Sequence, residues 1–209
     1  PRRRTLRTLP APPLMHGAAM WNAISTWISG GTIVIQDQVA HLDPTDVLDT
    51  CERHAVSSVL IVGDAMGRPM IESLEAIEAD GEELDLTCLL SLSSSAAIFS
   101  PTVKQRYLER FPNLVITDSI GATESGMNGI VTVGKDNTAM KGGPTVTPMK
   151  DTVVLDDDLK PVQPGSGVIG KVARGGNIPL GYYKDPVKTA ETWITAADGQ
   201  RYAMPGDFA

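Results

Sequence analysis

Cysteine is scarce in the 209-residue sequence, which contains only Cys51 and Cys88. The two stand in no metal-binding spacing and both fall within apolar patterns, so the sequence predicts buried thiols rather than a disulfide framework. Buried free thiols are typical of a reducing compartment, and we expect a cytoplasmic protein.

Basic residues are also fewer than acidic ones: the sequence has 18 Lys and Arg and 25 Asp and Glu, which gives a net charge of -7. This balance argues against a broad nucleic-acid-binding surface. The exception is the basic start of the chain, at Arg2, Arg3, Arg4 and Arg7, which we interpret as a solvated segment.

Several signals of other protein classes are missing. The sequence shows no apolar run long enough to cross a bilayer and no signal peptide. It shows no G-x-S-x-G elbow, which disfavours a serine hydrolase. It begins at Pro1 without an initiator methionine and stops at "PGDFA", so we expect a piece of a longer protein.

The first half of the sequence alternates between helical and strand-like patterns. Helices are expected at 20–28 (closed by Gly30 and Gly31), from Asp43-Pro44, at 69–79 and from Ser100-Pro101. Strands are expected at 32–36, 57–63, 86–92 and 113–117. Because these strands lack polar alternation and are separated by helices, the pattern predicts an α/β fold with a parallel sheet covered by helices on both faces.

The second half is richer in Gly and Pro, and its strand-like stretches are short, at 129–134, 151–156 and 167–175. Residues 156–158 are expected at a hairpin tip. We therefore predict an α/β sheet subdomain at 1–130 and a small β-rich, barrel-like subdomain at 131–209, with the boundary near residues 126–140.

The stretch "DSIGATESG", residues 118–126, follows the expected strand at 113–117. Ligands of parallel sheets bind beyond the carboxyl ends of the strands. A carboxylate there, Glu124, suits Mg²⁺, the hydroxyl of Thr123 suits a phosphate oxygen, and Gly121 permits a tight turn. A turn with a solvated glutamate explains the same residues, since a lone G-x-T-E has many chance matches.

Three further stretches have both a functional and a structural interpretation. In "PAPPLMHGAAMW", His16 could border an apolar pocket or simply cap or pack a helix. In "YAMPGDFA", Asp207 could accept hydrogen bonds from a ribose diol or form a Pro-Gly-Asp turn. The stretch "GNIPLGYYKDPVKTAETW" predicts a loop entering a short helix, which could be purely structural.

Taken together and in order, these stretches resemble the adenylate-forming superfamily of acyl-CoA synthetases, firefly-type luciferases and nonribosomal peptide adenylation domains. "PPLMHGAAMW" resembles its proline-leucine-x-histidine motif and "SIGATES" its Y-G-x-T-E motif. "GYYKDPVKTAETW" resembles G-Y-x-x-x-P-x-x-T, and "YAMPGD" resembles T-G-D. "SSSAAIFSP", residues 93–101, resembles the segment that lines the adenine and acyl pocket.

The resemblance implies that ATP and a small-molecule carboxylic acid form an acyl-adenylate, whose acyl group passes to a thiol, usually that of coenzyme A. It implies catalytic roles for Thr123 and Glu124, with Glu124 as the ligand of Mg²⁺. It implies an acyl pocket bordered by His16, Trp21 and Ala122. The nucleotide-binding residues that it implies are Ser95, Ala96, Ala97, Asp118, Ser119, Ile120, Gly121, Thr123 and Asp207.

The sequence departs from the family pattern in four ways. Ile120 replaces the aromatic residue that stacks on adenine, and Pro205 replaces the threonine before Gly206. Nothing matches the phosphate loop, which is expected upstream, or the C-terminal domain with its catalytic lysine, which is expected downstream. We therefore expect part of a large N-terminal domain that does not catalyse adenylation by itself. Whether it forms a homodimer is left open.

The branch of the superfamily is suggested by what "MHGAAMWNAIS" contains. It lacks the aspartate with which amino-acid-activating domains pair the substrate amine, and it is rich in Met and Trp. We therefore favour a fatty-acyl-CoA synthetase, similar to actinobacterial ligases that include those acting on steroid side chains. Two alternatives remain: a non-catalytic nucleotide- or acyl-binding protein on the same fold, and a generic α/β domain with accidental motif matches.

Overall fold

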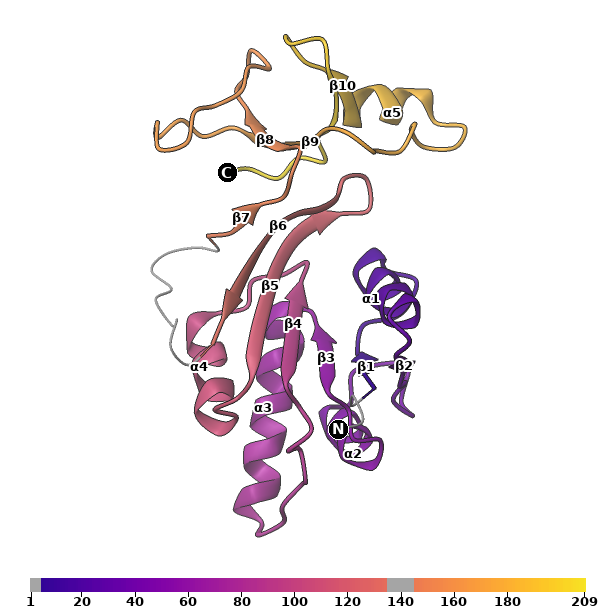
Figure 1. Cartoon of the computed structure of the whole chain (residues 1–209), viewed down its shortest axis with the longest axis vertical. Helices are drawn as coiled ribbons and strands as arrows, with labels where there is room; N and C mark the ends of the chain where they lie inside the picture. The colour runs from indigo at the N-terminus through magenta and orange to yellow at the C-terminus, as the bar shows by residue number, and fades with distance from the viewer. Residues whose placement is uncertain (1–4, 135–144) are drawn as a thin grey trace. The chain divides into compact units, whose positions relative to one another are not determined.

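The structure is a computed structural model of the chain, and it describes residues 5–134 and 145–209 (Figure 1). The chain divides into two compact units. The first unit comprises the described residues of Pro1–Asp118 and Val131–Thr145, and the second comprises Ser119–Ile130 and Val146–Ala209. The predicted arginines 2–4 and part of the predicted boundary at 126–140 lie outside the described residues.

The larger sheet has seven strands in the order β2-β1-β3-β4-β5-β6-β7. Their bounds are Arg7–Pro10 (β1), Thr32–Ile33 (β2), Ser58–Ile61 (β3), Ser91–Ser95 (β4), Val115–Ala122 (β5), Gly126–Val133 (β6) and Thr147–Pro148 (β7). The β2-β1, β1-β3 and β3-β4 pairs are parallel, whereas β6 and β7 are antiparallel. The predicted α/β fold is confirmed, with a mixed sheet in place of a fully parallel one.

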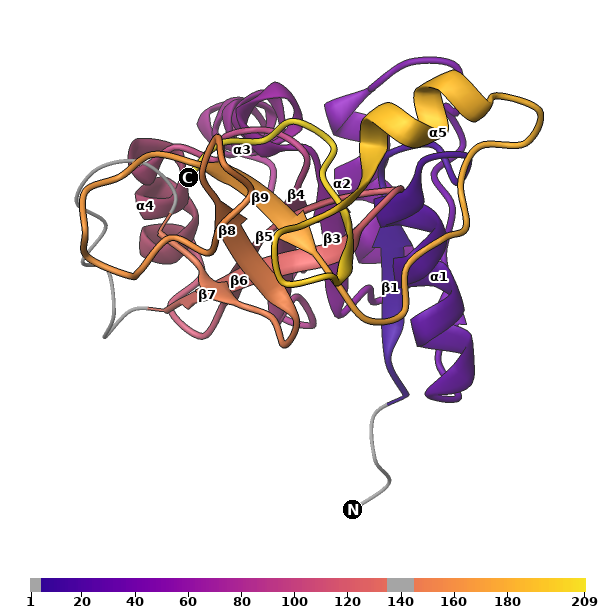
Figure 2. The same ribbon diagram turned by 90° about the horizontal axis from the view of Figure 1, so that it is seen from above.

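The described residues of the first unit form four helices: α1 (Gly17–Ile28), α2 (Pro44–Arg53), α3 (Gly63–Ala79) and α4 (Pro101–Arg110). α2 packs beside α3, and α3 beside α4, while α1 packs against β1 and β2 (Figures 1 and 2). Right-handed crossovers place α1 on the face opposite the other three, because the chain moves from β1 to β2 in one direction and from β2 to β3 in the other.

The helix ends follow the predicted local chemistry. The Asp43 carboxylate accepts hydrogen bonds from the backbone N–H groups of Thr45 and Asp46, at 3.1 and 3.2 Å. The Ser100 hydroxyl accepts one from the Val103 N–H at 3.4 Å. Each of these two helices has a proline in its first turn. Such caps satisfy N–H groups that have no partner within the helix.

Several predicted bounds are wrong. The strand expected at 32–36 is shorter, because β2 ends at Ile33. α3 begins at Gly63, so Pro69 lies inside the helix instead of starting it. β4 begins at Ser91, so most of the apolar run 86–92 is loop, although Leu86 and Leu89 remain buried in the core. β5 continues to Ala122, so the motif that starts at Asp118 begins inside the strand and not after it.

The core of the first unit lies between the sheet and the helices. It joins buried strand residues to the apolar sides of α2, α3 and α4; its members include Leu9, Val59, Ile61, Leu92, Ile116, Val47, Ile71, Leu74 and Val103. Cys51 is buried there and Cys88 is half-buried, and neither forms a disulfide. Within the described ranges, no helix combines the length and apolarity that crossing a membrane requires.

The second unit contains an open antiparallel sheet of four strands in the order β10-β11-β9-β8, with the helix α5 (Pro186–Thr192). The strands are Thr152–Leu155 (β8), Lys171–Arg174 (β9), Trp193–Thr195 (β10) and Arg201–Ala203 (β11). The predicted hairpin tip at 156–158 is confirmed, because the Val162 N–H donates to the Val154 carbonyl at 2.8 Å across it. Tyr202 and Leu155 belong to a small separate core.

Candidate functional site

Thr123 and Glu124 lie at the tip of the hairpin that joins β5 to β6, within the second unit. The backbone is close-packed here, because a Cβ at Gly121 would overlap the carbonyl oxygen of Gly126. Beneath the tip, the Asn128 side-chain amide donates to the buried Ser125 hydroxyl at 3.0 Å. The hairpin therefore presents an exposed hydroxyl and a half-buried carboxylate on a well-connected turn.

The Glu124 carboxylate contacts a side chain from a distant part of the sequence. Its Oε1 accepts a hydrogen bond from the Tyr182 hydroxyl at 2.6 Å. This bond is the main reason why the pKa of Tyr182 is raised above its usual value, and partial burial adds to the effect. Sequence reasoning assigned no role to Tyr182, although the motif that contains it was singled out.

The chemistry of the hairpin tip suits Mg²⁺ that arrives with a nucleotide. Over the part of the chain that the structure describes, no group of three or more His, Cys, Asp or Glu side chains could hold a metal by itself. Mg²⁺ usually keeps several waters and takes one or two carboxylates together with substrate phosphates. A single accessible carboxylate, Glu124, beside the Thr123 hydroxyl fits that mode.

Asp207 also belongs to the second unit. Its backbone carbonyl accepts the Val172 N–H at 2.8 Å, and Ala209 pairs with Gly170 through two bonds of 2.9 Å, so this segment runs beside β9. The Asp207 side chain is exposed, and Gly206 before it has φ +113°, which favours glycine. The carboxylate is thus free to reach solvent from an anchored backbone.

Of the predicted adenine-lining residues, Ser95 is the last residue of β4, and Ala96 and Ala97 follow it, all in the first unit. Their loop is fastened to the start of α3: the Asp64 N–H donates to the Ile98 carbonyl at 2.9 Å, and the Asp64 carboxylate accepts the Ser100 N–H at 2.8 Å. Ala96 and Ala97 are exposed. Asp64 was not predicted, and its place after an apolar strand was the available signal.

Asp118 lies on the part of β5 that belongs to the first unit, and it is buried. Its carboxylate accepts a hydrogen bond from Lys104 Nζ at 2.7 Å in a buried ion pair. The ammonium group also lies 5.3 Å from the centre of the Phe99 ring. Lys104 was missed by sequence reasoning, although the helical spacing of Val103, Lys104 and Tyr107 places all three on one face.

His16 immediately precedes α1 and Trp21 lies on it, both in the first unit. His16 occupies the N-cap position, but its side chain makes no capping hydrogen bond and is exposed. Trp21 is half-buried. The predicted site residues thus fall into two groups: His16, Trp21, Ser95, Ala96, Ala97 and Asp118 in the first unit, and Ser119, Ile120, Gly121, Ala122, Thr123, Glu124 and Asp207 in the second.

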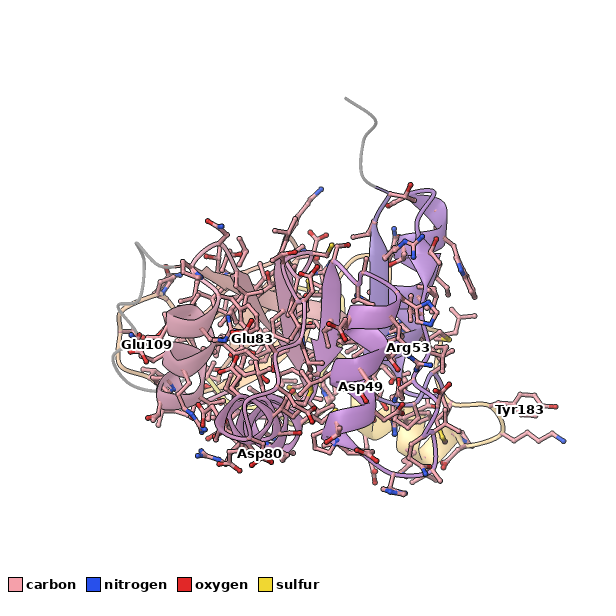
Figure 3. The ribbon with its side chains drawn as sticks, turned by 90° about the horizontal axis from the view of Figure 1, so that it is seen from below. Asp49, Arg53, Asp80, Glu83, Glu109 and Tyr183 are labelled. Carbon is pink, nitrogen blue, oxygen red and sulfur yellow. The ribbon has the colours of Figure 1, made fainter. Side chains whose placement is uncertain are left out.

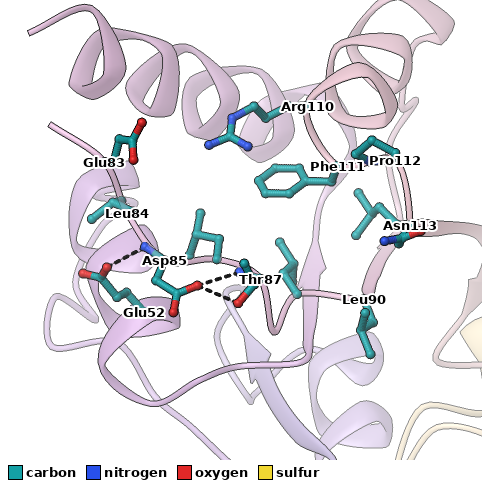
Figure 4. A pocket seen from close by; sticks show the side chains of 13 residues that line it. Glu52, Glu83, Leu84, Asp85, Thr87, Leu90, Arg110, Phe111, Pro112 and Asn113 are labelled. Atoms are coloured by element: carbon teal, nitrogen blue, oxygen red, sulfur yellow. Dashed lines mark hydrogen bonds between the residues drawn. The ribbon is translucent and has the colours of Figure 1, made fainter. Parts of the chain in front are cut away.

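A hollow of about 600 Å³ opens in the first unit among the residues that precede β4 and β5 (Figure 4). Arg110 and Phe111 line one side, and the Glu52 carboxylate accepts the Asp85 N–H at 2.6 Å on another. This is the amino end of the strands, whereas ligands of such sheets bind at the carboxyl ends. The hollow is therefore separate from the predicted nucleotide residues.

Comparison with solved structures supports the predicted fold. The structure of CmiS6 aligns with 98% of this chain and 49% of its own, with a TM-score of 0.83 at 22% identity. The N-terminal subdomain of Klebsiella oxytoca NpsA aligns with 98% of this chain and 51% of its own, with a TM-score of 0.76 at 19% identity. At such identities the likeness concerns the fold.

Curated sequences are much more similar. A medium/long-chain-fatty-acid–CoA/3-oxocholest-4-en-26-oate–CoA ligase of Mycolicibacterium smegmatis is 48% identical over 205 residues, 96% of this chain. A 3-oxocholest-4-en-26-oate–CoA ligase of Rhodococcus rhodochrous is 45% identical over 201 residues, again 96% of this chain. The chain spans 35% of the length of each. Residues 2–183 match the AMP-binding enzyme family, and the chain belongs to that family.

Proposed function

We propose that the full-length protein containing this chain is an AMP-forming acyl-CoA synthetase acting on a fatty or steroid-side-chain acid. The observation that carries the proposal is the identity of 45–48% to ligases named for such acids, across 96% of this chain. The match to the AMP-binding enzyme family spans residues 2–183, a range that includes the hairpin tip.

The reaction has two steps. The substrate carboxylate attacks the α-phosphorus of ATP, which forms the acyl-adenylate and releases pyrophosphate. The thiol of coenzyme A then attacks the acyl carbon and releases AMP. Both substrates of the first step are anions, so a catalyst must neutralise charge and fix their relative geometry.

We assign the neutralisation of phosphate charge to the hairpin tip. The Glu124 carboxylate would hold Mg²⁺, which when bound neutralises phosphate charge. The Thr123 hydroxyl, exposed beside it, would donate to a phosphate oxygen. The exposed Asp207 carboxylate would accept hydrogen bonds from the two ribose hydroxyls and anchor the nucleotide.

The remaining residues would shape the binding surfaces. Ser95, Ala96, Ala97 and the stretch from Asp118 to Gly121 would contact the nucleotide, and His16, Trp21 and Ala122 would border the acyl chain. Ile120 would cover adenine by apolar contact in place of stacking. We further propose that the protein works in the cytoplasm and that residues 1–209 alone do not form the adenylate.

The test is ATP–pyrophosphate exchange by the full-length protein with a panel of fatty, aryl, steroid and amino acids. We expect exchange with fatty or steroid acids and a loss of at least about 100-fold in Glu124→Ala, since the variant loses a charge-stabilising group. Glu191→Ala, which removes an exposed glutamate on α5, serves as the matched control. Silence across the panel from a folded full-length protein would favour the non-catalytic binding protein.

A further inference from the structure

The stretch "GYYKDPVKTAETW" has so far received no role in the chemistry. It contains Tyr182, whose hydroxyl reaches across 58 positions of sequence to the Glu124 carboxylate, with 2.6 Å between the two oxygens. Both residues belong to the second unit, and both are half-buried. A bond of this length between a neutral donor and a carboxylate is of the strong, charge-assisted kind.

The backbone of Tyr182 is held by the start of α5. The Thr189 hydroxyl accepts the Tyr182 N–H at 2.9 Å and donates to the Asp185 carbonyl at 2.6 Å. Asp185 also caps α5, with its carboxylate accepting the Lys188 N–H at 2.9 Å. A Cβ at Gly181 would overlap the Thr189 side chain, so glycine is needed for this close approach.

The ring of Tyr182 is held as well. It packs edge-on against the buried Trp193 ring, with centroids 4.9 Å apart and planes at 74°. The Arg201 guanidinium lies 5.8 Å from the centre of the Trp193 ring. It donates to the carbonyls of Pro179 and Leu180 at 2.9 and 2.7 Å, which fixes the chain just before Tyr182.

We propose that Tyr182 is a positioning residue for Glu124, held in place by the G-Y-x-x-x-P-x-x-T stretch. This inference rests on the proposed function. A free glutamate side chain samples many rotamers, and ordering it costs conformational entropy. The phenol hydroxyl holds Oε1 in one place before the nucleotide arrives, which leaves Oε2 for the cation. Partners of metal ligands commonly tune affinity in this way.

The test uses the full-length protein and Tyr182→Phe, which removes only the hydroxyl. The control is Tyr183→Phe, the same change at the next position, where the ring projects into solvent (Figure 3). Binding of Mn²⁺·ATP is followed by electron paramagnetic resonance of the metal, a readout that needs no turnover. We expect Tyr182→Phe to weaken binding by about tenfold and Tyr183→Phe to leave it unchanged.

A double-mutant cycle with Glu124→Ala separates positioning from a general structural role. Once Glu124 is absent, we expect Tyr182→Phe to change Mn²⁺·ATP binding by less than about twofold. Equal losses in the two backgrounds would overturn the proposal, because Tyr182 would then act independently of Glu124. Wild-type binding by Tyr182→Phe would overturn it as well.

Substitutions at Thr189 give a second test of the proposal that leaves the Tyr182 phenol unchanged. Thr189→Val keeps the shape but removes the hydroxyl that holds the Tyr182 backbone, and we expect it to weaken Mn²⁺·ATP binding in the same direction. Thr189→Ser restores the hydroxyl and should rescue binding. If Thr189→Ser bound Mn²⁺·ATP no more tightly than Thr189→Val, the proposed role of the Thr189 hydroxyl would be contradicted.

These measurements distinguish failure of the proposed function from failure of the positioning role of Tyr182. If the proposed function fails, the wild-type protein shows no exchange with any acid and Glu124→Ala does not alter Mn²⁺·ATP binding. If only the positioning role fails, wild type is active, Glu124→Ala loses binding, and Tyr182→Phe behaves like Tyr183→Phe.

Discussion

Replacing Lys104 by methionine should cost this chain far more stability than the same change at an exposed lysine. Lys104 is 1% exposed and pairs with Asp118, which is 6% exposed, at 2.7 Å. Methionine preserves most of the volume and removes the ammonium. The Asp118 carboxylate then remains in a buried site without its positive partner.

The expected loss of stability follows from the burial of the ion pair. Breaking a buried ion pair from one side costs about 3–5 kcal/mol, because an uncompensated charge is left inside. For a chain of this size that corresponds to a fall in melting temperature of roughly 6–20 °C. The comparison is Lys160→Met: Lys160 pairs with Asp158 at 3.2 Å, and their side chains are 63% and 75% exposed. Such exposed pairs contribute about 0–1 kcal/mol.

A third variant tests the electrostatic reason. In Lys104→Met/Asp118→Leu neither charge is present, so we expect most of the lost stability to return. If the double variant were as unstable as the sum of its two single variants, the cost would come from packing around the Phe99 ring and not from an unpaired charge.

The assay is urea unfolding combined with hydrogen exchange and mass spectrometry of peptides from α4 and β5. Exchange is needed because a chain with two compact units need not unfold in one step. Equal stability losses for Lys104→Met and Lys160→Met would refute the reasoning.

Three further predictions follow from local contacts. Gly181→Ala should destabilise the second unit by about 1–3 kcal/mol, because its Cβ overlaps Thr189, and exchange of the 181–193 peptide should rise. Burial favours a higher pKa for Asp64, but hydrogen bonds, chiefly from Ser100, outweigh it and lower the pKa below the usual 3.8. Asp64 therefore stabilises the fold above that pH and loses the effect as pH falls through the lowered pKa, so melting temperatures of wild type and Asp64→Asn should converge in acid; a constant gap would contradict this. Burial raises the pKa of Cys51 to about 12, so iodoacetamide should label it only after unfolding, and rapid native labelling would be the contrary result.

Much of the fold could be predicted from local sequence. The Asp43-Pro44 and Ser100-Pro101 helix starts were predicted correctly, because a capping side chain followed by proline acts within a single turn. The strand-like runs without polar alternation indicated an α/β sheet, because strands buried on both faces carry apolar side chains on both faces. The bounds of β4 were wrong because Ser91 to Ser95 form a strand through pairing with β3, which a serine-rich stretch does not indicate locally.

The order and spacing of the motifs were enough to place the chain in its family and to select Thr123, Glu124 and Asp207 as candidates. Only the tertiary structure showed that Thr123 and Glu124 form a hairpin tip and that Tyr182 donates to Glu124. Likewise, only the tertiary structure showed the ion pair between Asp118 and Lys104. The physical reason is distance along the chain: caps and periodicity act between near neighbours, whereas these contacts join residues 14 and 58 positions apart, which only the complete fold brings together.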